Sequence, residues 1–412
     1  MNLATCAGIE TGARHPLREA CDGDFAVASL LALPCGDRPA SITTGEAARL
    51  MLDVRTAATD DRWLLHAMEA GPLLRVPMQP RARGLTRAQV AAWAGMAADW
   101  IDRAMAGGDL RLLNTACKLI GGVWLYHRER GDAMLAGQLG FLGRRLDEAT
   151  TTLATRLQRR LLMPAEQFAT AAPAAAFAGA ARARLVVLTP AGSRSGAQLV
   201  SAAAIRGLPI AAVCWYSPRT RTASMASNYA TAWYPVGLST TAEDSPPEEP
   251  AMPVKRLRGW NETAAVLRAV QADVVVLAGM PIVPVEVLDA ARVGVVNAHN
   301  GMLPGLRGMD AIGWAVLTNQ PIVCTLHRAR PQVDSGEIIA SEPVALSPAH
   351  TLHARVKVTQ TRMLLRVAEY AAATGQLPDA TPQHGKPTQY YRLHPHLKRV
   401  LDASPYNHDS RR

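Results

Sequence analysis

The sequence predicts an α/β fold, in which an open, mostly parallel sheet domain follows a mainly helical domain. Two observations support this prediction. From residue 184 onward, short β-branched and apolar runs alternate with helical patterns, which is typical of strands buried on both faces of a parallel sheet. Between residues 87 and 162, apolar residues recur at the helical spacing instead. With 412 residues, the chain is long enough for two or three domains.

The helical domain is predicted from amphipathic periodicity. Val90, Trp93 and Trp100 recur near the helix period within its first run. Neighbouring amphipathic helices bury one another's apolar faces, so such runs form a bundle. Three runs separated by short polar or Gly-containing breaks share this pattern: residues 87–106, 110–131 and 133–162. We therefore assign residues 1–165 to a mainly helical N-terminal domain, whose role the sequence does not reveal.

The remaining chain is divided by composition. Residues 166–183 are rich in Ala and low in complexity, which indicates a linker. Residues 184–346 form the predicted catalytic domain, and residues 347–412 a C-terminal helix and a Tyr-Tyr-Arg tail. Asn261 is expected to cap a helix in the sheet domain. The clearest strands are residues 184–190, 209–216, 273–279 and 294–299. Ligands of open α/β sheets bind outside the carboxyl ends of the strands.

The composition narrows the class of protein. Six cysteines, at positions 6, 21, 35, 117, 214 and 324, lack metal-binding spacing, so we expect no structural zinc and reduced thiols. No apolar stretch approaches the roughly 20 residues of a membrane span, and the N-terminus lacks the apolar region of a secretory signal. We therefore expect a cytoplasmic protein. The net charge of +10 is spread along the chain, which weakly favours an anionic ligand and does not indicate a nucleic-acid site.

Polar residues gather where the last of these strands ends. Asn297 and His299 alternate with Ala298, so their side chains point to the same face. A later loop that carries Asp334 follows another predicted strand, which contains His327. An amide, an imidazole and a carboxylate can together support acyl transfer to an amine, through an oxyanion donor, a proton carrier and a group that orients the imidazole. The alternative is a hydrogen-bonded structural pair at a strand end.

Three stretches, "DVVVLAGMPIVPVEVL", "GVVNAHNGMLPGLRGMDAIGWAVL" and "CTLHRARPQVDSGEII", resemble the folate-dependent formyltransferases in order and spacing. That superfamily includes methionyl-tRNA, glycinamide ribonucleotide and sugar N-formyltransferases. The resemblance covers about residues 183–345. It is carried by Asn297, His299, Leu303-Pro304, Arg307-Gly308, His327 and the segment from Asp334 to Ile338. The family usually has a Ser after the His, where this chain has Gly301 and Met302.

The resemblance implies a Rossmann-like sheet and specific roles. Asn297, His299 and Asp334 would be the catalytic residues, 10-formyltetrahydrofolate the cosubstrate, and no metal would be needed. The pterin ring would lie in an apolar slot. The implied cosubstrate-binding residues are Met280, Ile282, Val283, Leu303 and Val333, and the implied substrate-binding residues are Gly301, Met302 and Arg307.

The expected reaction is formyl transfer to a primary amine of a small metabolite or biosynthetic intermediate. Initiator tRNA is not expected, because only a short basic tail follows the catalytic region, where tRNA-acting members carry a β-barrel domain. The helical domain could dock a carrier protein or a second copy of the chain. Two alternatives remain open: a hydrolase of the same superfamily that releases formate, and a non-catalytic folate-binding or scaffolding protein.

Overall fold

The computed structural model describes residues 87–158, 177, 179–217, 254–344, 351–391 and 393–402. These residues fall into two compact units. The helical unit contains the described residues of 87–156 and 391–401, and the sheet unit contains those of 157–217 and 254–390 together with Asp402. The predictions made for residues 1–86 and for most of the linker lie outside the described residues.

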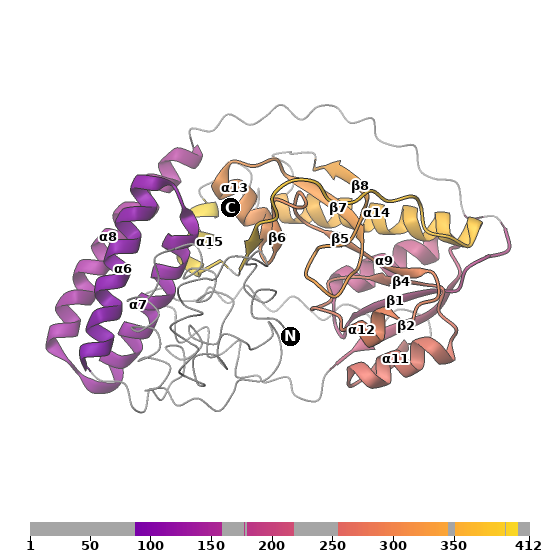
Figure 1. Cartoon of the computed structure of the whole chain (residues 1–412), viewed down its shortest axis with the longest axis horizontal. Helices are drawn as coiled ribbons and strands as arrows, with labels where there is room; N and C mark the ends of the chain where they lie inside the picture. Colours follow the sequence, from indigo (N-terminus) through magenta and orange to yellow (C-terminus); the bar gives the residue numbers. More distant parts are fainter. Residues whose placement is uncertain are drawn as a thin grey trace, which may run out of the picture. The chain divides into compact units, whose positions relative to one another are not determined.

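The helical unit is built on long amphipathic helices, as the sequence predicts (Figure 1). The Asp109 carboxylate caps the second of them by accepting from the Arg111 N–H. Gly131 ends this helix in the left-handed conformation at φ 67°, and its N–H donates to the His127 carbonyl. The helices are α6 (Arg87–Gly107), α7 (Leu110–Arg130), α8 (Ala133–Gln158) and the short α15 (Pro395–Asp402).

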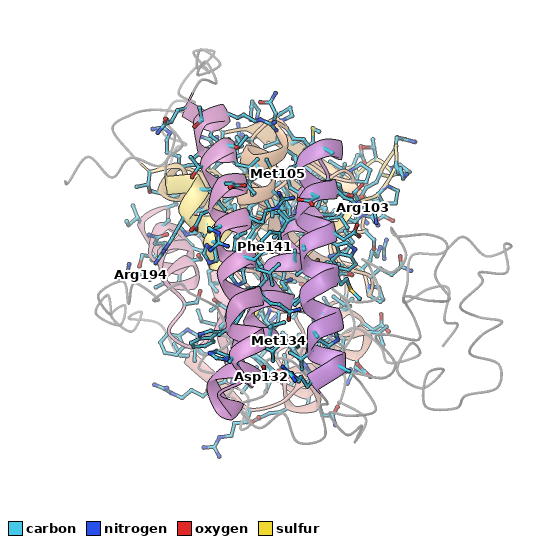
Figure 2. All side chains as sticks on the ribbon, turned by 90° about the vertical axis from the view of Figure 1, so that its left-hand side faces the viewer. Arg103, Met105, Asp132, Met134, Phe141 and Arg194 are labelled. Carbon is cyan, nitrogen blue, oxygen red and sulfur yellow. The ribbon has the colours of Figure 1, made fainter. Side chains whose placement is uncertain are left out.

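The core of the helical unit contains Trp93 and Trp100, which are almost fully buried. The Asn114 side chain on α7 accepts a hydrogen bond of 2.7 Å from the His394 N–H, which attaches the segment that leads into α15. Part of the predicted C-terminal tail therefore packs with the helical unit. On α8, Met134 and Phe141 lie on the exposed side of this unit (Figure 2).

The sheet unit contains a seven-stranded sheet with the order β3-β2-β1-β4-β5-β7-β8 (Figure 1). The first five strands of this order run parallel, whereas β7 pairs antiparallel with β5 and with β8. This confirms the predicted open, mostly parallel sheet. The strands are β1 (Leu185–Pro190), β2 (Ile210–Tyr216), β3 (Val254–Leu257), β4 (Val274–Leu277), β5 (Gly294–His299), β7 (Val323–Arg328) and β8 (Ile338–Pro343).

Helices cover both faces of the sheet, so its central strands β1 and β4 are apolar and buried on both sides. In Figure 1, α9 (Arg194–Ile205) and α14 (Leu352–Thr374) lie together on one face, and α11 (Trp260–Ala269) and α12 (Val285–Leu288) cover the other. The predicted Asn261 cap is wrong. The residue before α11 is Gly259, and the Glu262 carboxylate accepts from the Arg258 N–H instead, at 2.7 Å.

A second, two-stranded sheet fixes the loop that follows His299. In it, β6 (Arg307–Gly308) pairs in parallel with β9 (Gln389–Tyr390), and α13 (Ala311–Thr318) follows β6. Gly308 has φ 96°, and a Cβ there would overlap the Gln389 side chain and the Tyr390 carbonyl. Only glycine fits this position. None of the helices in the described part of the chain is long and apolar enough to cross a membrane.

Candidate active site

The pairing of β5 with β7 places three polar side chains on one face. Asn297 lies directly opposite His327, and His299 lies opposite Thr325. Residues directly opposite each other in an antiparallel pair share a face, as do alternate residues along one strand. Asn297, His299 and His327 therefore form one group at the carboxyl end of β5. The sequence predicted the shared face of Asn297 and His299.

The loop between β7 and β8 brings Asp334 into this group. Its Oδ2 atom lies 3.3 Å from His299 Nδ1, and its Oδ1 atom lies 3.5 Å from His327 Nε2. Oδ2 also accepts a hydrogen bond of 2.9 Å from the Gly308 N–H. One carboxylate, whose side chain is only 11% exposed, thus connects two imidazoles with the loop after His299.

His299 is held by both of its ring nitrogens. Nε2 lies 2.6 Å from the Leu306 carbonyl oxygen, so the neutral ring carries its proton on Nε2 and has its lone pair on Nδ1, toward Asp334. Burial lowers the pKa of His299 below its ordinary 6.5, while Asp334 and the Leu306 carbonyl oppose that shift. Burial therefore favours the neutral form of the ring, which has its basic nitrogen beside a carboxylate.

Asp334 is charged in this arrangement. Burial alone would raise its pKa, but the positive charge that His299 and His327 carry when protonated and the hydrogen bond from Gly308 together hold the pKa below its ordinary 3.8. A carboxylate beside a neutral imidazole stabilises the imidazolium when a proton arrives. The pair is therefore suited to accept one proton during a reaction.

Asn297 has one N–H group available for a ligand. Nδ1 of His327 lies 2.8 Å from the Arg328 carbonyl oxygen, so a neutral His327 presents its lone pair at Nε2. Asn297 Nδ2 lies 3.3 Å from that atom and donates one of its two N–H groups to it. The second N–H of this half-buried amide is left to polarise a carbonyl oxygen.

The residues expected to bind the pterin lie in the loops that follow β4, β5 and β7. Val283 and Leu303 are buried, Met280 and Val333 are half-buried, and Ile282 is 50% exposed. None of the backbone hydrogen bonds among the described residues involves Met280, Ile282 or Val283. Val283 belongs to the hydrophobic core and Met280 packs against it, so this segment offers the exposed Ile282 side chain together with backbone groups.

The residues expected to bind the acceptor lie in the loop after His299. A Cβ on Gly301 would lie 2.7 Å from both His299 Nε2 and the Leu306 oxygen, so the glycine permits that hydrogen bond. Met302 is half-buried beside it. The Arg307 guanidinium donates to Gln383 Oε1 at 2.6 Å, and burial lowers its pKa, which Asp334 opposes. Substrate contact by Gly301, Met302 and Arg307 stays a prediction.

Sequence reasoning missed two side chains that support this site. Thr325 Oγ1 donates to the Gly301 carbonyl at 2.8 Å, which holds the loop after His299. The Gln383 amide donates to the carbonyls of Asp334 and Gly336, both at 2.8 Å. The strand register could have indicated Thr325, because it lies opposite His299. Nothing in the local sequence pattern indicates Gln383.

This fold and site define an open α/β protein with a buried imidazole–carboxylate pair and an amide donor at the carboxyl edge of its sheet. Among the residues that the structure describes, no group of three or more His, Cys, Asp or Glu side chains could hold a metal ion. Residues 184–368 match the family described as Formyl transferase. This segment, slightly less than half of the chain, therefore resembles the formyltransferases.

Individual proteins resemble parts of the chain. The methionyl-tRNA formyltransferase of Acidovorax ebreus (strain TPSY) is 32% identical over 126 residues, which are 29% of this chain and 39% of that protein. The methionyl-tRNA formyltransferase of Chlorobium chlorochromatii (strain CaD3) is 29% identical over 138 residues, or 32% of this chain and 41% of that protein. The chain thus spans about two fifths of the length of these curated relatives.

A solved structure, phosphoribosylglycinamide formyltransferase from Bacillus halodurans, aligns with a TM-score of 0.35 and 22% sequence identity. The alignment covers 47% of this chain and 97% of that one.

Proposed function

We propose that the chain is an N-formyltransferase that moves the formyl group of 10-formyltetrahydrofolate to a primary amine. The observation that supports this most strongly is the convergence of Asn297, His299 and Asp334, which offers an N–H donor, a basic nitrogen and a carboxylate within one connected group. The family match of residues 184–368 supports the same reaction class.

In the proposed reaction, the acceptor amine attacks the formyl carbon, and the formyl oxygen gains negative charge. The free N–H of Asn297 donates to that oxygen, which stabilises the transition state. Nitrogen becomes positive in the adduct and must lose a proton. Because His299 is only 5% exposed, this proton passes through the Asp334 carboxylate to Nδ1 of His299. The bond from carbon to the folate nitrogen then breaks, and that nitrogen takes a proton back.

The pair of His299 and Asp334 suits this proton transfer. The Leu306 carbonyl fixes the ring with Nδ1 toward the carboxylate, so no rotation of the imidazole is needed. Burial keeps the ring neutral beforehand, and the carboxylate stabilises the imidazolium afterwards. The charge stays within the pair while the oxyanion exists, and the amine is then free to leave as the formamide.

Several residues are suited to hold the formyl donor. Ile282 and the half-buried Met280 present apolar surface after the end of β4, Val283 contributes backbone groups there, and Leu303 and Val333 come from two other loops. A slot that is mostly apolar with a few backbone donors and acceptors suits a flat heterocycle such as a pterin. When bound, the donor supplies an activated formyl group, and the remaining chemistry falls to Asn297, His299 and Asp334.

The acceptor that we propose is a small molecule with a primary amine. The two curated relatives described above are methionyl-tRNA formyltransferases, so methionyl-tRNA is included in the test. The purified chain is incubated with 10-formyltetrahydrofolate and a panel of amino sugars, amino acids and methionyl-tRNA, and tetrahydrofolate is followed by absorbance. His299→Ala is compared with His353→Ala, which removes an exposed imidazole on α14.

We expect tetrahydrofolate to form only when one class of amine is present, and His299→Ala to abolish that formation while His353→Ala retains it. Equally fast formation of tetrahydrofolate without any amine would contradict the transferase and indicate the hydrolase. Binding of the folate without release under any condition would contradict an enzymatic role.

A further inference from the structure

The side chain of Gln383, between α14 and β9, is bonded to two parts of the active site at once. Its Nε2 donates to the backbone carbonyls of Asp334 and Gly336, both at 2.8 Å. Its Oε1 accepts from Arg307 Nη2 at 2.6 Å. A single amide therefore joins the loop of Asp334 to the loop that follows His299.

The Asp334 loop needs such support. Asp334 adopts φ 48°, in the left-handed region that non-glycine residues rarely occupy and that the surroundings must hold. The two Gln383 bonds secure the carbonyls at each end of the tripeptide that begins with Asp334. At Gly336, the last residue of this tripeptide, a Cβ would overlap the Arg328 carbonyl, so the backbone is closely packed there. The direction of the carboxylate thus depends on these contacts.

The acceptor atom of Gln383 acts on Arg307. This guanidinium lies close enough to Asp334 for the carboxylate to raise its pKa against the lowering effect of burial. Gln383 Oε1 holds one end of the guanidinium at 2.6 Å. Released from it, Arg307 could turn toward the carboxylate and compete with His299 for it. Both ends of the Gln383 amide therefore favour the contact between His299 and Asp334.

We propose that Gln383 is a positioning residue, which holds Asp334 against His299 through its two donated hydrogen bonds and restrains Arg307 through its carbonyl oxygen. The effect on turnover rests on the proposed function, whereas the effect on the His299–Asp334 contact does not. His299 and Asp334 face each other, and the other charged or titratable groups that face this pair are His327 and Arg307.

The test replaces Gln383 with Met, which keeps the length and removes all three hydrogen bonds, and with Glu, which keeps the acceptor and removes the donors. Gln376→Met is the matched control, because this exposed glutamine lies seven positions earlier and its side chain forms no hydrogen bond with the described residues. Nitrogen-15 NMR of the imidazoles measures the pKa of His299, assigned with His299→Gln, and thermal melting checks that each variant is folded.

We expect the pKa of His299 to fall in Gln383→Met, because a displaced carboxylate no longer raises it, whereas in Gln383→Glu the added negative charge opposes that fall and kcat is the readout. The kcat of formyl transfer should fall by roughly 10- to 100-fold, with KM changed little, as for a misplaced catalytic group. Gln376→Met should match the wild type. An unchanged His299 pKa in folded Gln383→Met would overturn the proposal, as would a wild-type kcat in folded Gln383→Glu.

The two proposals fail separately. If the wild-type chain transfers no formyl group, the proposed function is contradicted, and the NMR titration still decides whether Gln383 positions Asp334. If transfer occurs but Gln383 variants retain both the His299 pKa and kcat, only the positioning role is wrong.

Discussion

Replacing Asp334 with Asn isolates the charge of the buried carboxylate. The substitution keeps the size of the side chain and the oxygen that accepts from the Gly308 N–H. It removes the negative charge that lies 3.3 Å from His299 Nδ1 and 3.5 Å from His327 Nε2. In the proposed reaction, that charge is needed when His299 becomes an imidazolium. The variant should therefore bind substrates and fail in the chemical step.

The expected size follows from the geometry. Charge is spread over the carboxylate and the ring, so the centres of charge lie roughly 4 Å apart, and two unit charges at that distance attract by about 4 kcal/mol at an effective dielectric constant of about 20. Loss of this attraction in the transition state lowers kcat by about 10³-fold. KM should change little, because the carboxylate acts after binding.

The assay is single-turnover formyl transfer between pH 5 and pH 8, with Glu337→Gln as the control. Glu337 lies in the same loop, but it forms an exposed ion pair with Arg330, so its loss should have little effect on kcat. The wild-type kcat/KM should fall as the pH drops through the lowered pKa of His299. In Asp334→Asn this acid limb moves to lower pH, because Asp334 raises that pKa. A kcat within about tenfold of the wild type would refute the proposed role of Asp334.

Three further predictions concern other parts of the structure. Asn297→Ala removes the donor to the formyl oxygen, so steady-state kinetics should show kcat reduced by about 10²- to 10³-fold with little change in KM; an equal rise in KM at constant kcat would contradict the oxyanion role. Gly301→Ala places a Cβ 2.7 Å from His299 Nε2, so denaturant unfolding should show a loss of about 1–3 kcal/mol of stability, and activity should fall as well. Gly305→Ala is the control, because the atoms nearest to its Cβ are 3.7 Å away, and it should be nearly neutral. In the helical unit, burial and the nearby His396 and Lys118 hold the pKa of His394 well below 6.5. The unfolded chain therefore binds the extra proton, and the free energy of unfolding falls as the pH drops. Between pH 7.5 and 5.5 this single group should account for about 1.4 kcal/mol, which His394→Gln should remove from the pH dependence of unfolding.

Much of the sheet unit could be predicted from local patterns. Buried parallel strands are continuous apolar runs, so β1, β2, β4 and β5 stand out in the sequence. The start of α11 was missed because Gly259 has no side chain to mark a cap, while Asn261 resembles one. The place of the segment before α15 was missed as well, since its contact with Asn114 joins residues that are 280 positions apart.

The candidate site was predictable as far as each residue lies on or directly after a strand. Asn297 and His299 share a face because of strand periodicity, and Asp334 follows the next strand of the sheet. The Leu306 carbonyl and the Gln383 amide could not be predicted in this way. One is a backbone group, and the other reaches Asp334 across 49 positions of sequence.

The most direct test of the proposed function follows the formyl carbon itself. The chain is mixed with 10-formyltetrahydrofolate labelled with carbon-13 in the formyl group, with and without the amine panel, and the product is identified by carbon-13 NMR. The proposed function predicts a new formamide signal that depends on the amine and is absent in His299→Ala. Labelled formate at the same rate with or without amine, or no loss of the donor signal at all, would contradict it.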